Sequence, residues 1–285
     1  MSSTETRRAL FEGLVCPACV RPLDLWDQDR VSPPRLSCAR CGRRWPICQR
    51  TPVFASTWSE AIPPGPAALL HDPDVEAWPD LQRSLERADP RLFAHVFASA
   101  QGAPPALPPF LAGARAAVLG CGWGRVASQL AEVCKEVYAS DDSHVRARFA
   151  NVRAYAEGRG NLLAATAGLD SLPFPAGVFH LVVVEERAVA AILRDRRYLL
   201  ARLGRARALL APDGVLAVCR QKQAGMAARW AARRLEAVLA QAGFAPAALP
   251  PPSARPEPRT WAVAARSRHA VSGHAASLAP LLAGL

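Results

Sequence analysis

The sequence lacks two features that would take a protein into or across a membrane. No apolar run in its 285 residues is long enough to span a bilayer. The N-terminal residues, Met1 to Arg8, do not form the apolar stretch of a secretory signal. We therefore expect a cytoplasmic protein that makes no membrane contact.

Lysine is nearly absent, although the chain is strongly basic. It occurs only at Lys135 and Lys222, so arginine carries almost all of the positive charge behind a formal net charge of +11. Such a charge is typical of proteins that bind the phosphates of nucleic acids. The basic residues are scattered along the sequence, however, without the interleaved aromatic residues that stack bases. A solvated basic surface is the favoured interpretation, and a nucleic-acid footprint is the alternative.

Four of the eight cysteines are arranged in two closely spaced pairs. Cys16 and Cys19 form the first pair, Cys38 and Cys41 the second, with the spacing C-x2-C-x18-C-x2-C. Four thiolates from two tight turns can surround Zn²⁺ tetrahedrally and leave no position open for catalysis. Disulfides are disfavoured in a chain without an export signal. The spacing predicts a structural zinc site, whereas Cys48 lies outside the pairs and is expected to be a buried thiol.

A glycine-rich loop follows a short apolar stretch near residue 120. Ala117–Leu119 leads into Gly120-Cys121-Gly122-Trp123-Gly124, and a helical pattern begins directly afterwards. Glycines are needed where a bound nucleoside approaches the backbone more closely than a Cβ atom permits. The next apolar segment ends at Asp141-Asp142, and a carboxylate there can accept hydrogen bonds from both ribose hydroxyls. Together these features predict a nucleoside cofactor.

The glycine spacing separates two kinds of cofactor. A dinucleotide fingerprint requires G-x-G-x-x-G, but here the third glycine comes one position earlier and Arg125 takes its place. A nucleoside-binding oxidoreductase is therefore the least favoured function. From about Leu111, apolar strands alternate with amphipathic helices, which predicts an α/β fold with a parallel sheet. We expect strands over residues 116–119 and 136–140 and a helix over 126–135.

The G-x-G-x-G loop resembles motif I of the class I S-adenosylmethionine (SAM)-dependent methyltransferases. Two later segments are similar to the same family: Leu172-Pro173-Phe174 with the apolar run Phe179–Val183, and Arg207–Val218 around Pro212-Asp213-Gly214. The resemblance covers most of residues 111–267. It implies a Rossmann-like methyltransferase sheet, with SAM as the cofactor and an unidentified methyl acceptor as the partner.

The resemblance also implies which residues form the site. Glu185 and Glu186 follow the apolar run Phe179–Val183 closely. Glu185 is the candidate for an acid that faces cofactor or substrate, and a solvated Glu-Glu-Arg loop is an alternative at least as well supported. No side chain identifies the accepting atom. The residues expected to bind the cofactor are Gly120, Cys121, Gly122, Gly124, Asp141, Asp142, Leu169 and Asp170.

Three acids that are usual in this family are missing. Val118 occupies the strand position two residues before the first loop glycine, Gly168 occupies the position of the adenine-contacting acid, and His180 replaces a strand aspartate. Asp170 is a substitute candidate for the adenine contact, and His180 is expected to be a strand-end histidine. The losses favour a second hypothesis, a catalytically silent scaffold that binds a protein or RNA partner.

The cysteine region resembles the Trm112-like zinc ribbon over roughly residues 10–56, with its second cysteine pair running into Trp45-Pro46-Ile47. The expected domains are therefore the ribbon (1–56), a proline-rich connector with one helix over 80–98 (57–110), the methyltransferase domain (111–268) and a tail (269–285). The leading hypothesis is a SAM-dependent methyltransferase with a structural zinc ribbon, acting on RNA, protein or a small molecule. The ribbon and the basic surface favour a macromolecular acceptor.

Overall fold

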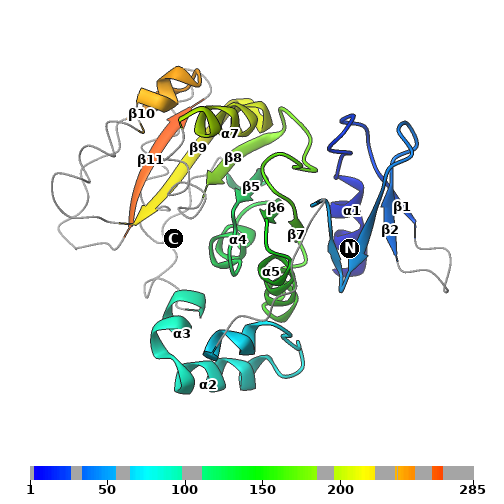
Figure 1. Cartoon of the computed structure of the whole chain (residues 1–285), viewed down its shortest axis with the longest axis vertical. Coiled ribbons are helices and arrows are strands. Elements are labelled where there is room, and N and C mark those ends of the chain that lie inside the picture. Colours follow the sequence, from blue (N-terminus) through cyan, green and yellow to red (C-terminus); the bar gives the residue numbers. More distant parts are fainter. Residues whose placement is uncertain are drawn as a thin grey trace. The chain divides into compact units, whose positions relative to one another are not determined.

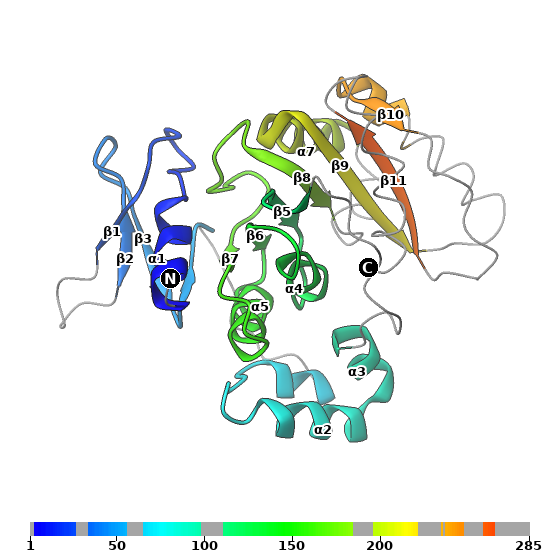
Figure 2. The ribbon, with the colours of Figure 1, turned by 180° about the vertical axis from the view of Figure 1, so that it is seen from behind.

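The computed structural model describes residues 3–26, 34–55, 65–97, 111–184, 196–221, 235, 237–247 and 259–265. Figure 1 and Figure 2 show it from opposite sides. The chain divides into two compact units. Unit 1 comprises Met1–Gln101, Cys121–Glu132 and Glu136–Pro175, and unit 2 comprises Gly102–Gly120, Val133–Lys135 and Ala176–Leu285.

Unit 1 begins with a small module that contains the paired cysteines and extends to about residue 55; we call this module the ribbon. Its antiparallel sheet has the order β1-β2-β3-β4, with β1 at Asp24–Trp26, β2 at Arg35–Ser37, β3 at Arg44–Cys48 and β4 at Thr51–Pro52. A helix that was not among the predicted elements, α1 (Ser3–Glu12), precedes the sheet. The β3–β4 hairpin turns at Gln49 and Arg50, both with positive φ (46° and 63°), as a two-residue loop between twisted strands requires.

The connector contains a short 3₁₀ helix, η1 (Gly65–Leu70), followed by α2 (Trp78–Ala88) and α3 (Pro90–Phe97). The prediction of one continuous helix over 80–98 was wrong. Pro90 has no N–H and disfavours a helical conformation at the preceding residue, and Asp89 is extended with φ −155° and ψ 91°. The Asp89 carboxylate then accepts a hydrogen bond from the Leu92 N–H (2.9 Å), which caps the new helix.

The remainder of unit 1 contains α4 (Arg125–Ala131), β6 (Glu136–Asp141), α5 (His144–Ala156) and β7 (Leu162–Thr166). Strand β6 follows its prediction within one residue, whereas α4 ends earlier than the predicted helix over 126–135. Strands β6 and β7 pair in parallel, with Asp141 opposite Thr166. Their carboxyl ends therefore lie at the same edge.

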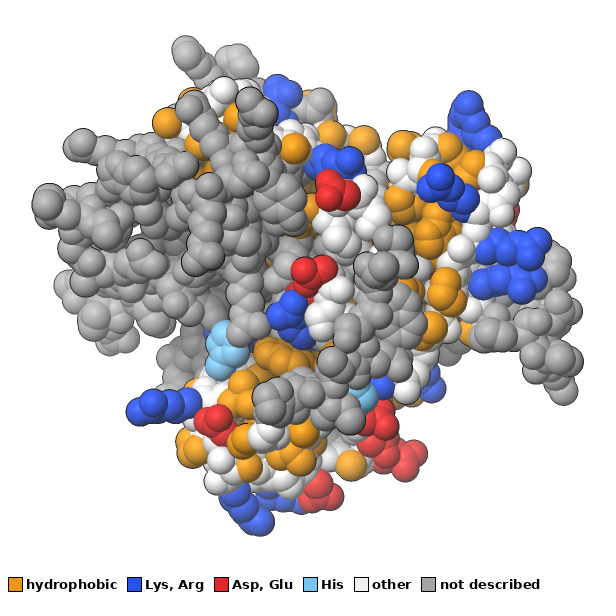
Figure 3. Space-filling view, viewed as in Figure 1, with side chains coloured by type: hydrophobic (Ala, Val, Ile, Leu, Met, Phe, Trp, Pro, Cys, Tyr) orange, Lys and Arg blue, Asp and Glu red, His pale blue; other side chains and the backbone are white. Residues whose placement is uncertain are grey.

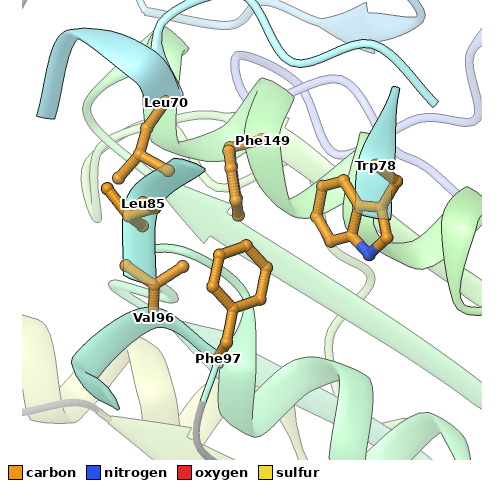
Figure 4. Close-up of a cluster of buried hydrophobic side chains, with 6 residues drawn as sticks. All are labelled: Leu70, Trp78, Leu85, Val96, Phe97 and Phe149. Carbon is orange, nitrogen blue, oxygen red and sulfur yellow. The ribbon is translucent and has the colours of Figure 1, made fainter. Parts of the chain in front are cut away.

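The connector helices pack on α5 through a buried aromatic cluster (Figure 4). The ring of Phe149 on α5 contacts those of Trp78 and Phe97, with centroids 5.4 Å and 6.0 Å away, and these two rings also contact each other at 5.4 Å. The guanidinium of Arg153, also on α5, donates to the Val96 carbonyl (2.6 Å) and lies over the Phe97 ring. The members of the cluster are Leu70, Trp78, Leu85, Val96, Phe97 and Phe149. Burial of these side chains holds the helical pair on this face of α5.

The end of the ribbon pairs with β7. Val53 forms a parallel bridge with Thr166, and the Phe54 N–H donates to the Thr166 carbonyl at 2.8 Å. Farther along β7, the buried Asn151 amide of α5 takes the place of a strand partner. It accepts from the Ala164 N–H (2.9 Å) and donates to the Ala164 carbonyl (2.7 Å) and to Thr51 Oγ1 (3.0 Å). The ribbon and Asn151 together provide hydrogen-bond partners for backbone N–H and C=O groups in this part of β7.

Replacing Asn151 by leucine should lower the free energy of unfolding by about 2–4 kcal/mol, because buried backbone and hydroxyl groups lose their partners. Urea denaturation followed by circular dichroism measures the loss. The control is Asn161→Leu, since Asn161 donates to the Ala131 carbonyl (2.8 Å) at a half-buried position and should cost only about 1 kcal/mol. Equal losses in the two variants would contradict the role assigned to Asn151.

Unit 2 contains β5 (Arg115–Leu119), β8 (Phe179–Val184), α7 (Arg196–Leu209), β9 (Leu210–Gln221), β10 (Ala245–Ala247) and β11 (Arg259–Ala265). Its strands follow the order β10-β11-β9-β8-β5. β5, β8 and β9 are parallel, and β11 and β10 add antiparallel strands. The predicted α/β class is confirmed. Among the described residues, no helix combines the length and apolar character needed to cross a membrane.

Candidate functional site

The glycine loop joins β5 to α4. Two of its glycines, Gly122 and Gly124, have different structural roles. Gly122 has φ +54°, and a Cβ built there would meet nothing within 4 Å. At Gly124, with φ +76°, a Cβ would lie 2.7 Å from the Ala150 Cβ of α5. Gly124 is therefore required for the packing of α4 against α5, whereas Gly122 leaves the backbone open to a ligand. Gly120 also has a positive φ, of 74°.

Asp141 at the carboxyl end of β6 is bonded directly to this loop. Its Oδ2 accepts from the Gly122 N–H (2.9 Å), and its Oδ1 accepts from the Ser143 N–H (2.9 Å) and from Arg146 Nε (2.8 Å). The side chain is only 4% exposed. The carboxylate thus fixes the loop relative to the start of α5. Because a carboxylate has about four lone-pair sites, Oδ2 keeps one for a further donor.

Burial raises the pKa of Asp141 to about 6, although Arg146 and the backbone N–H groups of Ser143 and Gly122 act in the opposite direction. The charged carboxylate therefore has incomplete compensation for the water it has lost. A ligand hydroxyl that donated to Oδ2 would stabilise the charged form.

The other predicted cofactor residues lie around the same strand ends. Asp142 has an 80% exposed side chain and forms an ion pair with Arg146 (3.0 Å). The Ala167 N–H donates to the Asp141 carbonyl (2.9 Å), which brings the turn after β7 beside Asp141. In that turn Leu169 is buried and Asp170 is exposed. Cys121 is buried, and its N–H donates to the Ser140 carbonyl of β6 (2.9 Å).

Trp123 is a site-neighbouring residue that sequence reasoning missed. Its ring meets Phe149 edge-on, at 5.3 Å between centroids and 79° between planes. It packs against the aromatic cluster of the connector helices. A large aromatic residue between two loop glycines is the only sequence signal for this contact. The glycine loop is thereby held from the side of α5.

Two of the three positions that lack the usual acid, Val118 and His180, lie in unit 2. Val118 is fully buried in β5. His180 is at the start of β8, where its Nδ1 accepts from the Arg115 N–H at 3.3 Å, consistent with the expected strand-end histidine. The predicted acids Glu185 and Glu186 lie outside the described residues.

The four paired cysteines of the ribbon form one cluster. Their Sγ atoms all lie within 4.8 Å of one another, with 3.6 Å between Cys16 and Cys41 and 3.4 Å between Cys19 and Cys38. Tetrahedral Zn–S bonds of about 2.3 Å place sulfurs about 3.8 Å apart, so the donor set fits zinc. Cys48 is half-buried on β3, outside the cluster.

Hydrogen bonding and burial shift the pKa values of two of the cluster thiols in opposite directions. The N–H of Cys41 lowers the pKa of Cys38 to about 7, because it stabilises the thiolate. Burial raises the pKa of Cys16 to about 12. A bound cation would favour the thiolate at every position, since metal ligation displaces the proton.

Residues 117–214 match a family model described as a methyltransferase domain. No curated protein sequence matches the chain. The match lies inside the residues predicted for the methyltransferase domain and includes the glycine loop, Asp141 and Asp142. The chain therefore carries a methyltransferase domain, and the prediction of a methyltransferase is confirmed to this extent. The predicted domain bounds and site residues stay predictions.

Several solved structures are similar to the chain at low identity. They include the YcgJ protein from Bacillus subtilis (16% identity, TM-score 0.41, 47% of this chain and 63% of that one). Magnesium protoporphyrin IX methyltransferase from Synechocystis PCC 6803, with bound SAM, has 23% identity and a TM-score of 0.42 over 55% of this chain and 72% of that one. The pyocyanin biosynthetic protein PhzM has 17% identity and a TM-score of 0.48 over 68% of this chain and 60% of that one.

Proposed function

We propose that the protein is a SAM-dependent methyltransferase whose cofactor binds beside the glycine loop. The observation that carries the proposal is the buried Asp141 carboxylate, bonded to the Gly122 N–H at a point where Gly122 itself faces open space. In this arrangement Oδ2 of Asp141 would accept a hydrogen bond from a ribose hydroxyl of the cofactor. Asp142, Leu169 and Asp170 are the further residues of the proposed cofactor site.

The chemistry asks little of the protein side chains beyond binding and alignment. SAM supplies an activated methyl group when bound. The chain has to hold that group in line with the accepting atom, and orientation of this kind contributes a large part of such a rate enhancement. Asp141, the Gly122 backbone and the packed Trp123 serve this purpose by fixing the loop. The acceptor class is RNA, protein or a small molecule.

The ribbon is proposed to be Trm112-like and to hold one structural zinc ion through Cys16, Cys19, Cys38 and Cys41. Four thiolate ligands leave no coordination position for substrate or water, so the ion would stabilise the module without taking part in transfer. The short Sγ distances support this assignment. Elemental analysis should find about one zinc per chain.

Binding of S-adenosylhomocysteine to the full chain tests the cofactor site. Calorimetry should give a 1:1 complex, and Gly122→Ala should weaken it at least tenfold, because the added Cβ enters the open space at the loop. The matched control is Gly158→Ala: Gly158 also has a positive φ (+70°) and open space. Both variants carry backbone strain of about 1–2 kcal/mol, but only the loop variant should lose binding. Failure of the wild-type protein to bind at millimolar concentration would overturn the proposal.

A catalytically silent scaffold is the second candidate function, favoured by the fully buried, apolar Val118 and the absent side chain at Gly168. The two functions differ in one measurement. Incubation with methyl-labelled SAM and fractionated lysate should label an RNA, protein or small-molecule fraction if the first function is right. Cofactor binding without any labelled fraction, together with a stable partner in pull-downs, would favour the scaffold.

A further inference from the structure

Four exposed arginines surround the cysteine cluster of the ribbon. Arg21 follows the first cysteine pair, Arg40 lies inside the second, and Arg43 and Arg44 follow it. We call Arg21, Arg40, Arg43 and Arg44 the knuckle arginines. Arg21 is distant in sequence from the other three, and the cysteine cluster brings its turn beside theirs.

The two cysteine turns have equivalent backbone geometry, and this places two of the arginines. The Cys16 N–H donates to the Arg21 carbonyl (2.7 Å), and the Cys38 N–H donates to the Arg43 carbonyl (2.9 Å). In each turn the residue before the arginine has a positive φ, 57° and 68° respectively. Since the Sγ atoms of the two turns lie within 4.8 Å of one another, Arg21 and Arg43 flank the same centre from two sides.

None of the knuckle arginines forms an ion pair with an acidic side chain in the part of the chain that the structure describes. Figure 3 shows blue side chains on the ribbon, at the right of the view, with little red beside them. A cysteine-bound zinc centre would carry a net charge of about −2, which compensates only part of this positive charge. The ribbon therefore presents surplus positive charge to a partner.

The surface favours a phosphate backbone over a protein partner. Protein interfaces are organised around buried aromatic and apolar anchors, but Val20 is the only exposed large hydrophobic residue that the structure describes on the ribbon. Arginine matches phosphate geometry with two parallel hydrogen bonds. The knuckle arginines lie on turns and at a strand start, and not on a helix of the kind that reads the major groove of B-DNA.

We propose that the knuckle arginines form a binding surface for the phosphate backbone of RNA. The inference goes beyond methyl transfer and does not depend on it, because RNA binding is measured without SAM. It adds a site that lies on the ribbon and not in the methyltransferase domain.

The test uses the full-length, zinc-loaded protein and a fluorescein-labelled RNA hairpin with a single-stranded loop. Replacing the four knuckle arginines by glutamine should weaken binding at least tenfold at 0.1 M salt. It should also make the slope of log K against log[salt] shallower by about 3. The matched control replaces four other exposed arginines by glutamine, Arg8, Arg83, Arg87 and Arg91, with the same change in net charge. This variant should keep at least a third of the wild-type affinity.

Two outcomes would overturn the proposal. One is an equal effect of the two quadruple variants; the other is binding of polyglutamate or duplex DNA as tight as that of RNA and equally sensitive to the knuckle substitutions. A second measurement avoids substitution altogether. RNA should protect the knuckle arginines, and not the four control arginines, from phenylglyoxal in the wild-type protein. Absence of this protection would also overturn the proposal.

Discussion

Replacing Cys16 and Cys38 by serine is expected to abolish zinc binding and to lower the free energy of unfolding by at least about 3 kcal/mol, because a structural zinc site contributes folding free energy directly. The loss should extend beyond the ribbon. Val53 and Phe54 cover part of the β7 edge, so an unfolded ribbon would expose that edge to other chains. Elemental analysis, denaturant unfolding and light scattering measure the three effects.

The control for this experiment is Cys48→Ser, which removes a half-buried thiol outside the cluster. That variant should keep about one zinc per chain and unfold within about 1 kcal/mol of the wild-type protein. A double-serine variant with unchanged stability and no aggregation would contradict the structural role of the metal. Full zinc content in the same variant would contradict the ligand assignment.

Replacing Asp141 by asparagine is expected to reduce the affinity for S-adenosylhomocysteine by about 10–100-fold. The carboxylate accepts from Gly122, Ser143 and Arg146, and an asparagine NH₂ group would face a donor at one of these positions. The loop would lose a bond and the cofactor would lose an acceptor. Calorimetry of the purified variant measures the change.

The same carboxylate predicts a pH dependence. Its pKa is raised from 3.8 to about 6, so in the folded chain it is partly protonated near pH 6. Ribose hydroxyls favour the charged form, so cofactor affinity should rise with pH between about 5 and 7 and be constant above. For folding without cofactor the sign is opposite. Between about pH 4 and 6 the folded chain holds this proton more tightly than the unfolded chain, so the contribution of Asp141 to stability falls as pH rises.

Asp142→Asn is the control for both measurements. Asp142 is exposed and loses only a surface ion pair with Arg146, worth less than about 1 kcal/mol. The affinity of the Asp142→Asn variant for S-adenosylhomocysteine should change less than about threefold, and the pH dependence of binding should persist. A larger loss of affinity in Asp142→Asn than in Asp141→Asn would assign the ribose contact to Asp142 instead.

Local patterns in the sequence were sufficient for several parts of the structure. The cysteine spacing predicted the cluster because a C-x-x-C turn directs both sulfurs to one point regardless of the rest of the chain. The apolar stretch before Gly120 and the acid at Asp141 predicted the ends of two strands and the loop between them. Each of these features depends on neighbours along the chain.

Other features depended on residues far apart in sequence. No local pattern shows that Asn151 completes the β7 backbone, that Trp123 packs on Phe149, or that Val53 pairs with Thr166. The break at Asp89 was readable from Pro90, and the single-helix prediction overlooked it. The basic residues looked scattered in sequence because the turns that gather Arg21 and Arg43 meet only through the cysteine cluster.

The sequence by itself therefore determined the α/β class, the methyltransferase motifs and the four-cysteine cluster, because these follow from periodicity and short spacing. The tertiary structure decided that Gly124 serves packing while Gly122 faces open space, and that Asp141 is buried and bonded to the loop. It also decided that the ribbon covers an edge of β7. These properties arise from burial and from partners distant along the chain, which fix pKa values and hydrogen bonds only once the chain has folded.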